Sequence, residues 1–130
     1  MVLASSTGEI DQAQRSLISA AQQRGYDRAS CFALRLALEE ALSNAILHGN
    51  RSNPQKNVTV RYQVDSGRVV IEVEDQGQGF DPEAVPDPTR TENLEIPAGR
   101  GIILMRAYMT EVQFAAPGNR VRMTFVRPTA

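Results

Sequence analysis

Glu40, Asn44 and His48 place an acid, an amide and an imidazole at positions i, i+4 and i+8 of one stretch of the chain. On an α-helix these positions form one narrow stripe. The stripe is flanked by apolar residues, namely Leu38, Ala41, Leu42, Ala45 and Ile46. This helix is therefore expected to pack against the rest of the protein. Because buried polar groups without hydrogen-bond partners are costly, the stripe needs polar partners, and a bound ligand would supply them.

A second polar feature begins where an apolar run ends. Asp75 follows residues 69–74 directly, and Gly77 and Gly79 come next. Glycine lets the backbone turn sharply and approach a ligand closely. A carboxylate accepts a hydrogen bond from the exocyclic amine of adenine, whereas guanine offers a carbonyl at that position. Asp75 therefore indicates an adenine site, and the plainer alternative is an Asp that begins a turn.

A third feature is the sequence Gly99-Arg100-Gly101, which precedes a short helix expected to begin at Ile102. Free backbone N–H groups at a helix N-terminus form an anion site, so a triphosphate is expected there. Together with Asp75 and the stripe at Asn44, this feature predicts a site for ATP and magnesium. The chain has no G-x-x-x-x-G-K-[ST] element, which excludes a P-loop enzyme.

Composition narrows the class of protein. A chain of 130 residues favours one domain, 1–130, with one core. With 14 basic and 15 acidic residues the formal net charge is −1, so no basic field points to nucleic acid or to an anionic membrane. No apolar run is long enough to span a bilayer, and the first residues do not resemble a signal peptide. Cys31 is the only cysteine, which excludes an intrachain disulfide. A cytoplasmic protein is expected.

The hydrophobic pattern predicts an α+β fold. Apolar residues recur at helical spacing in two stretches, and apolar and polar residues alternate in four others. The expected helices are 9–24, 27–48 and 102–109, and the expected strands are 58–64, 69–73, 112–116 and 121–125. This order of elements predicts a two-layer sandwich, with helices on one face of a mostly antiparallel sheet.

Residues 81–98 differ from the rest of the chain. They contain four prolines and several acids and have little periodicity. Long loops of this kind are usually functional or disordered. Because the segment lies between the two glycine-containing motifs, we expect it to be a mobile lid that becomes ordered over bound nucleotide.

These motifs resemble those of the GHKL ATPase superfamily, whose nucleotide-binding domain is the Bergerat fold. The segment 40–49 resembles the N box of that superfamily, 75–79 its first glycine box and 99–101 its second. The resemblance covers about residues 3–126. Within the superfamily the chain is most similar to the stand-alone serine/threonine kinases that act as bacterial anti-sigma factors.

The resemblance implies a role for each residue of the first two motifs. The matching asparagine of the family binds magnesium, so Asn44 is the expected metal ligand, and its carbonyl oxygen suits that ion. Glu40, one turn earlier, is the expected general base. Asp75 would contact the adenine amino group, and Gly77 and Gly79 would let the backbone pass beside the base. The structural alternatives are an Asn44 that ties the helix to a loop and a Glu40 that is a surface or capping carboxylate.

The remaining site residues have less specific roles. The resemblance implies a triphosphate at Gly99 and Gly101, where Arg100 would contact a phosphate or project to solvent. His48 would donate to a phosphate or, equally, interact with the helix dipole at a C-terminus. The family usually has a threonine in the turn before the last strand that supports the adenine contact. Asn119 occupies that turn here, and its amide is the expected substitute.

The resemblance implies an enzyme that uses ATP and Mg²⁺ to phosphorylate a serine or threonine of an anti-sigma-factor antagonist. It also implies that the chain binds a sigma factor, and it leaves a homodimer open. No direct contact with nucleic acid or membrane is expected. Two alternatives remain: a partner-switching module that binds ATP without transferring phosphate, and the detached ATP-binding domain of a histidine kinase. No dimerisation helix pair precedes Glu9, which favours the stand-alone kinase.

Overall fold

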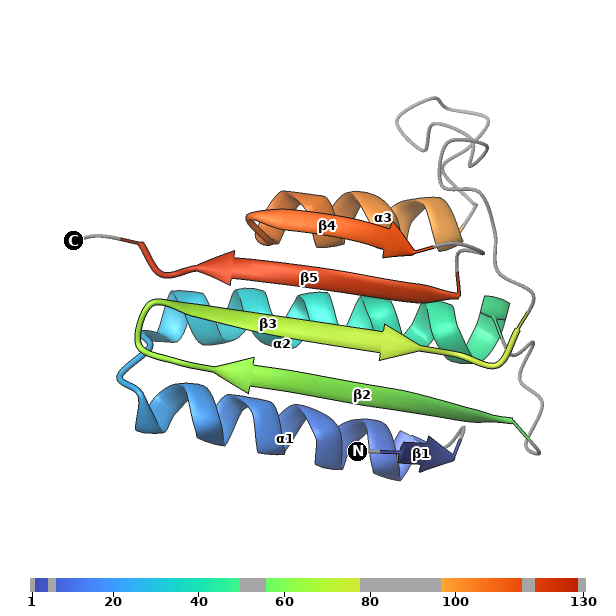
Figure 1. Cartoon of the computed structure of the whole chain (residues 1–130), viewed down its shortest axis with the longest axis horizontal. Helices are drawn as coiled ribbons and strands as arrows, with labels where there is room; N and C mark the ends of the chain where they lie inside the picture. The colour runs from blue at the N-terminus through green and yellow to red at the C-terminus, as the bar shows by residue number, and fades with distance from the viewer. Residues whose placement is uncertain (1, 5–6, 50–55, 78–96, 116–118, 129–130) are drawn as a thin grey trace.

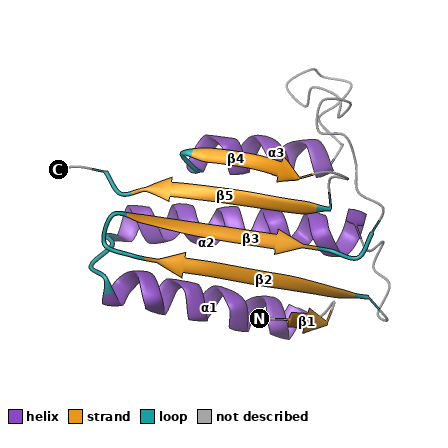
Figure 2. Ribbon diagram, viewed as in Figure 1, coloured by secondary structure: helices purple, strands orange, loops and turns teal. Residues whose placement is uncertain are grey.

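The protein folds into a five-stranded sheet covered by helices on one face (Figures 1 and 2). The computed structural model describes residues 2–4, 7–49, 56–77, 97–115 and 119–128. The elements are, in order, β1 (Val2–Ala4), α1 (Thr7–Gln23), α2 (Arg28–Ser43), η1 (Asn44–Gly49), β2 (Asn57–Val64), β3 (Arg68–Glu74), α3 (Pro97–Tyr108), β4 (Glu111–Ala115) and β5 (Arg120–Val126). The predicted α+β class and its two layers are confirmed.

The strand order in the sheet is β1-β2-β3-β5-β4, and each pair of neighbours is antiparallel. Every second side chain of the central strands is buried against the helices, as the alternating pattern predicted. These residues are Val58, Val60, Val69, Ile71, Val73, Val121, Met123 and Phe125. They meet the buried faces of α1 and α2 in one hydrophobic core.

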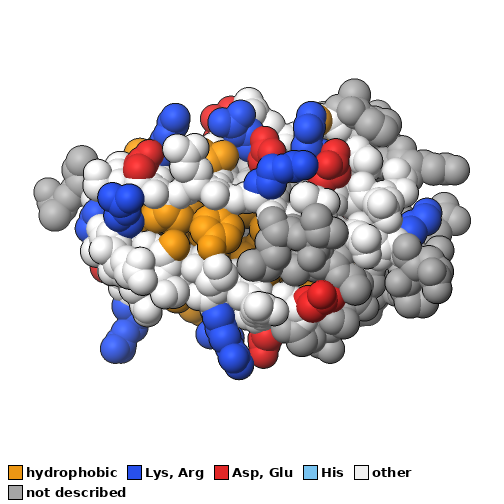
Figure 3. Space-filling view, turned by 60° about the horizontal axis from the view of Figure 1, so that its bottom comes forward, with side chains coloured by type: hydrophobic (Ala, Val, Ile, Leu, Met, Phe, Trp, Pro, Cys, Tyr) orange, Lys and Arg blue, Asp and Glu red, His pale blue; other side chains and the backbone are white. Residues whose placement is uncertain are grey.

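The opposite face of the sheet is charged. Arg61 on β2 lies 3.9 Å from both Glu72 and Glu74 on β3. With the lower edge of the sheet brought forward, basic and acidic side chains stand beside one another along the upper margin of the molecule (Figure 3). The sheet therefore has one buried and one polar face, as the period of two predicts.

Helix α1 begins and ends close to its predicted limits, and α2 begins at its predicted cap. Asp27 caps α2 by accepting a hydrogen bond from the Ser30 N–H at 2.8 Å. Gly25 joins α1 to α2 with a φ of 81°, a conformation that glycine adopts without strain. No helix within the described ranges combines the length and apolar character needed to cross a membrane.

The structure differs from the sequence prediction at three elements. The short strand β1 was not predicted, and it pairs with the start of β2. The expected single helix 27–48 changes at Asn44 from an α-helix to the π-helix η1. Helix α3 begins at Pro97 rather than at Ile102, because proline is favoured in a first helical turn.

These differences affect two predicted motifs. Gly99, Arg100 and Gly101 lie within the first turns of α3 instead of preceding it. Residues 97 and 98 of the predicted lid belong to the same helix. The rest of the lid, together with Gly79, lies outside the described residues.

Arg127 ties three segments together at the end of β5. Its guanidinium donates to the carbonyl oxygens of Arg24 at 3.0 Å, Ser66 at 3.2 Å and Gly25 at 2.5 Å. It also lies over the Tyr26 ring, 4.8 Å from the centroid. One side chain thus links β5 to the α1–α2 connection and to the β2–β3 turn.

We expect Arg127→Ala to lower the free energy of unfolding by about 1–2 kcal/mol, because several hydrogen bonds and a cation–π contact are lost from a partly exposed site. Urea denaturation measures the change. The matched control is Arg28→Ala, which removes an exposed arginine for which no ion pair is recorded among the described residues. Equal effects of the two substitutions would contradict a specific role for Arg127.

Candidate functional site

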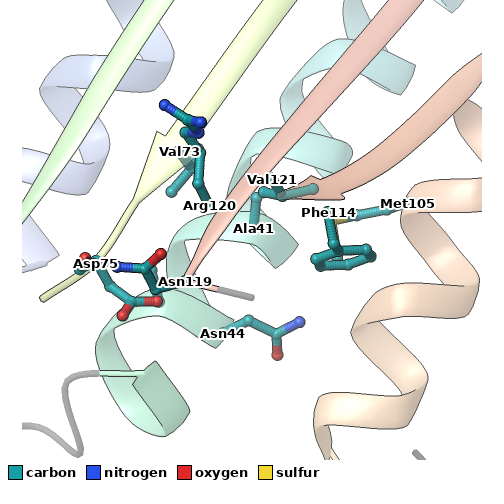
Figure 4. A pocket seen from close by; sticks show the side chains of 10 residues that line it. Ala41, Asn44, Val73, Asp75, Met105, Phe114, Asn119, Arg120 and Val121 are labelled. Atoms are coloured by element: carbon teal, nitrogen blue, oxygen red, sulfur yellow. Dashed lines mark hydrogen bonds between the residues drawn. The ribbon is translucent and has the colours of Figure 1, made fainter. Parts of the chain in front are cut away.

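A small cavity lies where the end of α2 meets β3, β5, β4 and α3 (Figure 4). It brings together Asn44 and Asp75, which the sequence placed in separate motifs. Its walls are the side chains of Ala41, Asn44, Ala45, Val73, Asp75, Met105, Phe114, Asn119, Arg120 and Val121. Its volume is about 20 Å³, room for about one water molecule. A ligand as large as a purine would therefore require these walls to separate.

Asp75 is buried directly after β3, with only 9% of its surface exposed. Its Oδ1 accepts a hydrogen bond from the Gly77 N–H at 2.7 Å, so Gly77 helps to orient the carboxylate. Desolvation raises the pKa of Asp75 above its ordinary value, and the charge of Glu74 adds to this. The Gly77 hydrogen bond and Lys56 oppose the rise in pKa. A desolvated carboxylate of this kind gains most from a ligand that donates a hydrogen bond to it.

Asn119 holds Asp75 through two backbone contacts. The Asp75 N–H donates to the Asn119 carbonyl oxygen at 2.9 Å, and the Asn119 Nδ2 donates to the Asp75 carbonyl oxygen at 3.1 Å. Figure 4 shows the two side chains next to each other at one end of the cavity. Both contacts engage the Asp75 backbone, so Asn119 positions this segment. Neither contact uses the Oδ1 atom of Asn119.

Asn44 supplies the second polar group of the cavity. It is the first residue of η1, and its N–H donates to the carbonyl oxygens of Glu40 and Ala41 at the end of α2. Its Nδ2 is buried and has no hydrogen-bond partner within the described part of the chain. Burying a hydrogen-bond donor without a partner costs free energy. Unpaired buried groups of this kind are typical of sites where a ligand supplies the missing partner.

Glu40 lies one helical turn before Asn44 and is half-buried. It is not among the residues that line the cavity. Desolvation raises the pKa of its carboxyl group, and the charge of Glu39 raises it further. The bond from the Asn44 N–H to the Glu40 carbonyl keeps these two residues in α-helical register. The change to a π-helix after Asn44 means that this register does not extend to His48.

Several predicted site residues have no described side chain. His48 has a described backbone in η1, and Arg100 has one in α3, as do Gly99 and Gly101. Among the described residues no group of three His, Cys, Asp or Glu side chains could hold a metal ion. A magnesium ion at Asn44 would therefore need most of its oxygen ligands from water or from a bound phosphate, as is usual for this ion.

The pattern of the sequence did not identify the apolar walls as site residues. Val73 and Val121 were predicted as strand residues, and nothing local marks Met105 or Phe114 as neighbours of Asp75. These four side chains meet only because α3 packs beside β4 and β5 pairs with both β3 and β4.

Known proteins are similar to this chain over most of its length. The family model that describes the histidine kinase-like ATPase domain matches residues 3–125 of this chain. An anti-sigma F factor from Thermoanaerobacter sp. (strain X514) is 33% identical over 96 residues, which cover 70% of this chain and 66% of that protein. The serine-protein kinase RsbW of Bacillus velezensis is 30% identical over 116 residues, which cover 84% of this chain and 72% of that protein. The chain thus spans about two thirds of the length of these relatives.

We expect Asp75→Asn to raise the free energy of unfolding at neutral pH, because it removes a desolvated charge and its Oδ1 can still accept from Gly77. The pKa of Asp75 is higher in the folded state than in the unfolded state. The stability contributed by its protonated form is therefore fully present below the unfolded-state pKa and is lost as pH rises through the folded-state pKa. The advantage of the variant should therefore disappear in acid. Urea denaturation across a pH series measures it.

Asp65→Asn is a control of opposite sign. Hydrogen bonds from the Arg68 and Gly67 backbone lower the pKa of Asp65, so its contribution is present at neutral pH and is lost as pH falls. This variant should be less stable than the parent at neutral pH. If Asp75→Asn behaved in the same way, the Asp75 carboxylate would be a stabilising group rather than a desolvated one.

Proposed function

The chain belongs to the histidine kinase-like ATPase family, and on that premise we propose that it binds ATP at the cavity formed by Asp75 and Asn44. We propose further that it transfers the γ-phosphate to a serine or threonine of an anti-sigma-factor antagonist and also binds a sigma factor. The observation that carries the proposal is the unpartnered buried amide of Asn44 in the same cavity as the desolvated carboxylate of Asp75.

Adenine would be recognised by Asp75. Its carboxylate accepts a hydrogen bond from the exocyclic amine, and Asn119 fixes the Asp75 backbone on which that contact depends. The apolar side chains of Val73, Met105 and Val121 would pack against the base. Because the cavity is small, we expect binding to move β4 or α3 away from the end of α2.

Asn44 fits a magnesium ion that is shared with the phosphates. Its carbonyl oxygen would be a suitable ligand. Its buried Nδ2, which has no partner among the described residues, is a donor and would suit a phosphate oxygen. When bound, the ion neutralises charge on the phosphate oxygens. Asn44 would hold the ion from a helix end whose register is set by the bonds to Glu40 and Ala41.

Glu40 would accept the proton of the attacking hydroxyl. The pKa of Glu40 is raised toward neutral pH, and a general base is most effective when its pKa lies near the working pH. Its half-buried position one turn from Asn44 supports a role next to the phosphates rather than next to the base. The names of two relatives, a serine-protein kinase and an anti-sigma F factor, support a serine substrate and a sigma-factor partner.

A second candidate function is a module that binds ATP and switches partners without transferring phosphate. It is favoured by one observation, namely that Glu40 does not line the cavity that contains Asn44 and Asp75. The two functions differ in whether labelled phosphate reaches an antagonist protein. Incubation of the chain with labelled ATP and a candidate antagonist distinguishes them.

We expect the chain to bind ATP at least about a hundredfold more tightly than GTP, because a site built around one hydrogen bond leaves its polar group unpaired with the wrong base. Calorimetric titration with both nucleotides measures the ratio. Asp75→Asn should weaken ATP binding while the protein stays folded. Equal affinity for the two nucleotides would show that Asp75 does not read the base.

Asn44 and Glu40 should separate binding from chemistry. Asn44→Ala should lose the magnesium-dependent part of ATP affinity without loss of stability, since the amide it removes has an unpaired buried group. Glu40→Gln should retain ATP affinity and transfer phosphate about a hundredfold more slowly. Nucleotide titration and phosphotransfer assays on both variants test this.

Glu39→Gln is the matched control, because Glu39 is the exposed neighbour of Glu40 and loses the same charge. It should keep a transfer rate close to that of the parent, with only the small change expected from losing a charge that raises the pKa of Glu40. If Glu40→Gln also kept the parent rate, Glu40 would be a structural carboxylate. If the parent bound ATP but phosphorylated no antagonist, the switching module would replace the kinase.

A further inference from the structure

A large groove follows the outer edge of β4. Its volume is about 640 Å³, and it is lined by Glu72, Arg106, Val112, Gln113, Phe114, Ala115, Arg120 and Arg122. Within the described residues β4 pairs only with β5, so its other edge has no neighbouring strand. The lining includes consecutive residues of β4, whose side chains alternate between the two faces of the sheet. The groove therefore wraps around the strand edge, from α3 to the open face of the sheet.

The charged residues of this groove are mainly basic. Arg106 comes from α3, and Arg120 and Arg122 come from one face of β5. All three are exposed, and none is recorded in an ion pair with a described residue. Glu72 is the single acid of the lining, and Arg61 already lies 3.9 Å from it.

Two further acids lie near the groove but do not line it, namely Glu111 on β4 and Glu74, which is opposite Arg120 in the sheet register. Glu111 begins β4, and its Oε1 accepts a hydrogen bond from the Gln113 Nε2 at 2.6 Å. The lining itself has three arginines and one glutamate, an excess of positive charge on a chain whose formal net charge is −1. A local excess of this kind favours an anionic ligand, while the overall charge does not favour nucleic acid.

We propose that this groove binds an extended acidic segment of a partner protein, which adds a strand to the free edge of β4. Backbone N–H and C=O groups on an open strand edge pair readily with a second extended chain. Alternate side chains of the added strand would face Arg106 on one side of the sheet and Arg120 and Arg122 on the other. Arginine suits this role because its guanidinium binds carboxylates through paired hydrogen bonds.

The groove adjoins the cavity of Asp75 and Asn44. Phe114 and Arg120 line both, so a segment in the groove would contact a shared wall of the two sites. Arg106 and Arg122 line only the groove. Substitution of these two arginines therefore tests the proposal without altering the cavity, and the proposal stands whether or not the cavity binds ATP.

The experiment measures fluorescence anisotropy of a labelled peptide with the repeat Thr-Thr-Glu-Glu, whose glutamates face both sides of an added strand, titrated with the full chain. The double variant Arg106→Gln/Arg122→Gln should bind at least about tenfold more weakly than the parent, because two charge-assisted contacts are lost. Arg28→Gln, which loses an exposed arginine outside the groove, should bind as the parent does. Unchanged binding by the double variant, or an equal loss in Arg28→Gln, would overturn the proposal.

Two further probes test strand addition itself. The same peptide with every backbone nitrogen methylated keeps its charge but has no N–H to donate from either edge, so its binding should be lost. Hydrogen exchange at residues 111–115 should slow when the unmethylated peptide is present. Equal binding of the methylated peptide would show that the arginines attract charge alone. Tighter binding of a single-stranded oligonucleotide, lost in the double variant, would assign the groove to nucleic acid.

Discussion

The pairing of β3 with β5 places Glu74, the last residue of one strand, opposite Arg120, the first residue of the other. Ile71 and Met123 face each other in the middle of this ladder and are fully buried. The next hydrogen bond along the ladder is the one from the Asp75 N–H to the Asn119 carbonyl. The position of Asp75 thus depends on the register of the two central strands, and a slip of one residue would turn its carboxylate to the opposite face.

The candidate site is where the structure leaves polar groups incompletely satisfied. Asp75 is desolvated, and the Asn44 Nδ2 has no partner among the described residues, while the surrounding core consists of well-packed apolar side chains. Both features reduce the stability of the chain in the absence of a ligand. Natural proteins keep such groups mainly where function requires them, so their presence in one cavity is informative.

The end of α2 joins the core to the site. Before Asn44, the α2 side chains of Leu34, Leu38 and Leu42 are buried in the core. Asn44 then begins the π-helical segment η1. A π-helix is uncommon and often occurs at functional positions, because it changes the direction of side chains after a regular helix. The charged groove along β4 begins on the other side of Phe114, so the same wall separates an apolar cavity from a basic surface.

The sequence by itself determined the kind of each main element and singled out Asn44, Asp75 and Asn119, which line the cavity. The helical and alternating periods identified α1, α2 and the four longer strands, because periodicity reports which side chains share a face. Asp27 marked the start of α2, because an aspartate side chain can accept a hydrogen bond from the first helical turn. Gly25 marked the end of α1, because glycine adopts a positive φ without strain. Tertiary structure decided which faces meet: the contact of Asn119 with Asp75, the apolar walls from α3 and β4, and the groove along β4. The short strand β1 and the π-helix at Asn44 depend on pairing and packing with distant residues, and local periodicity contains no information about those partners.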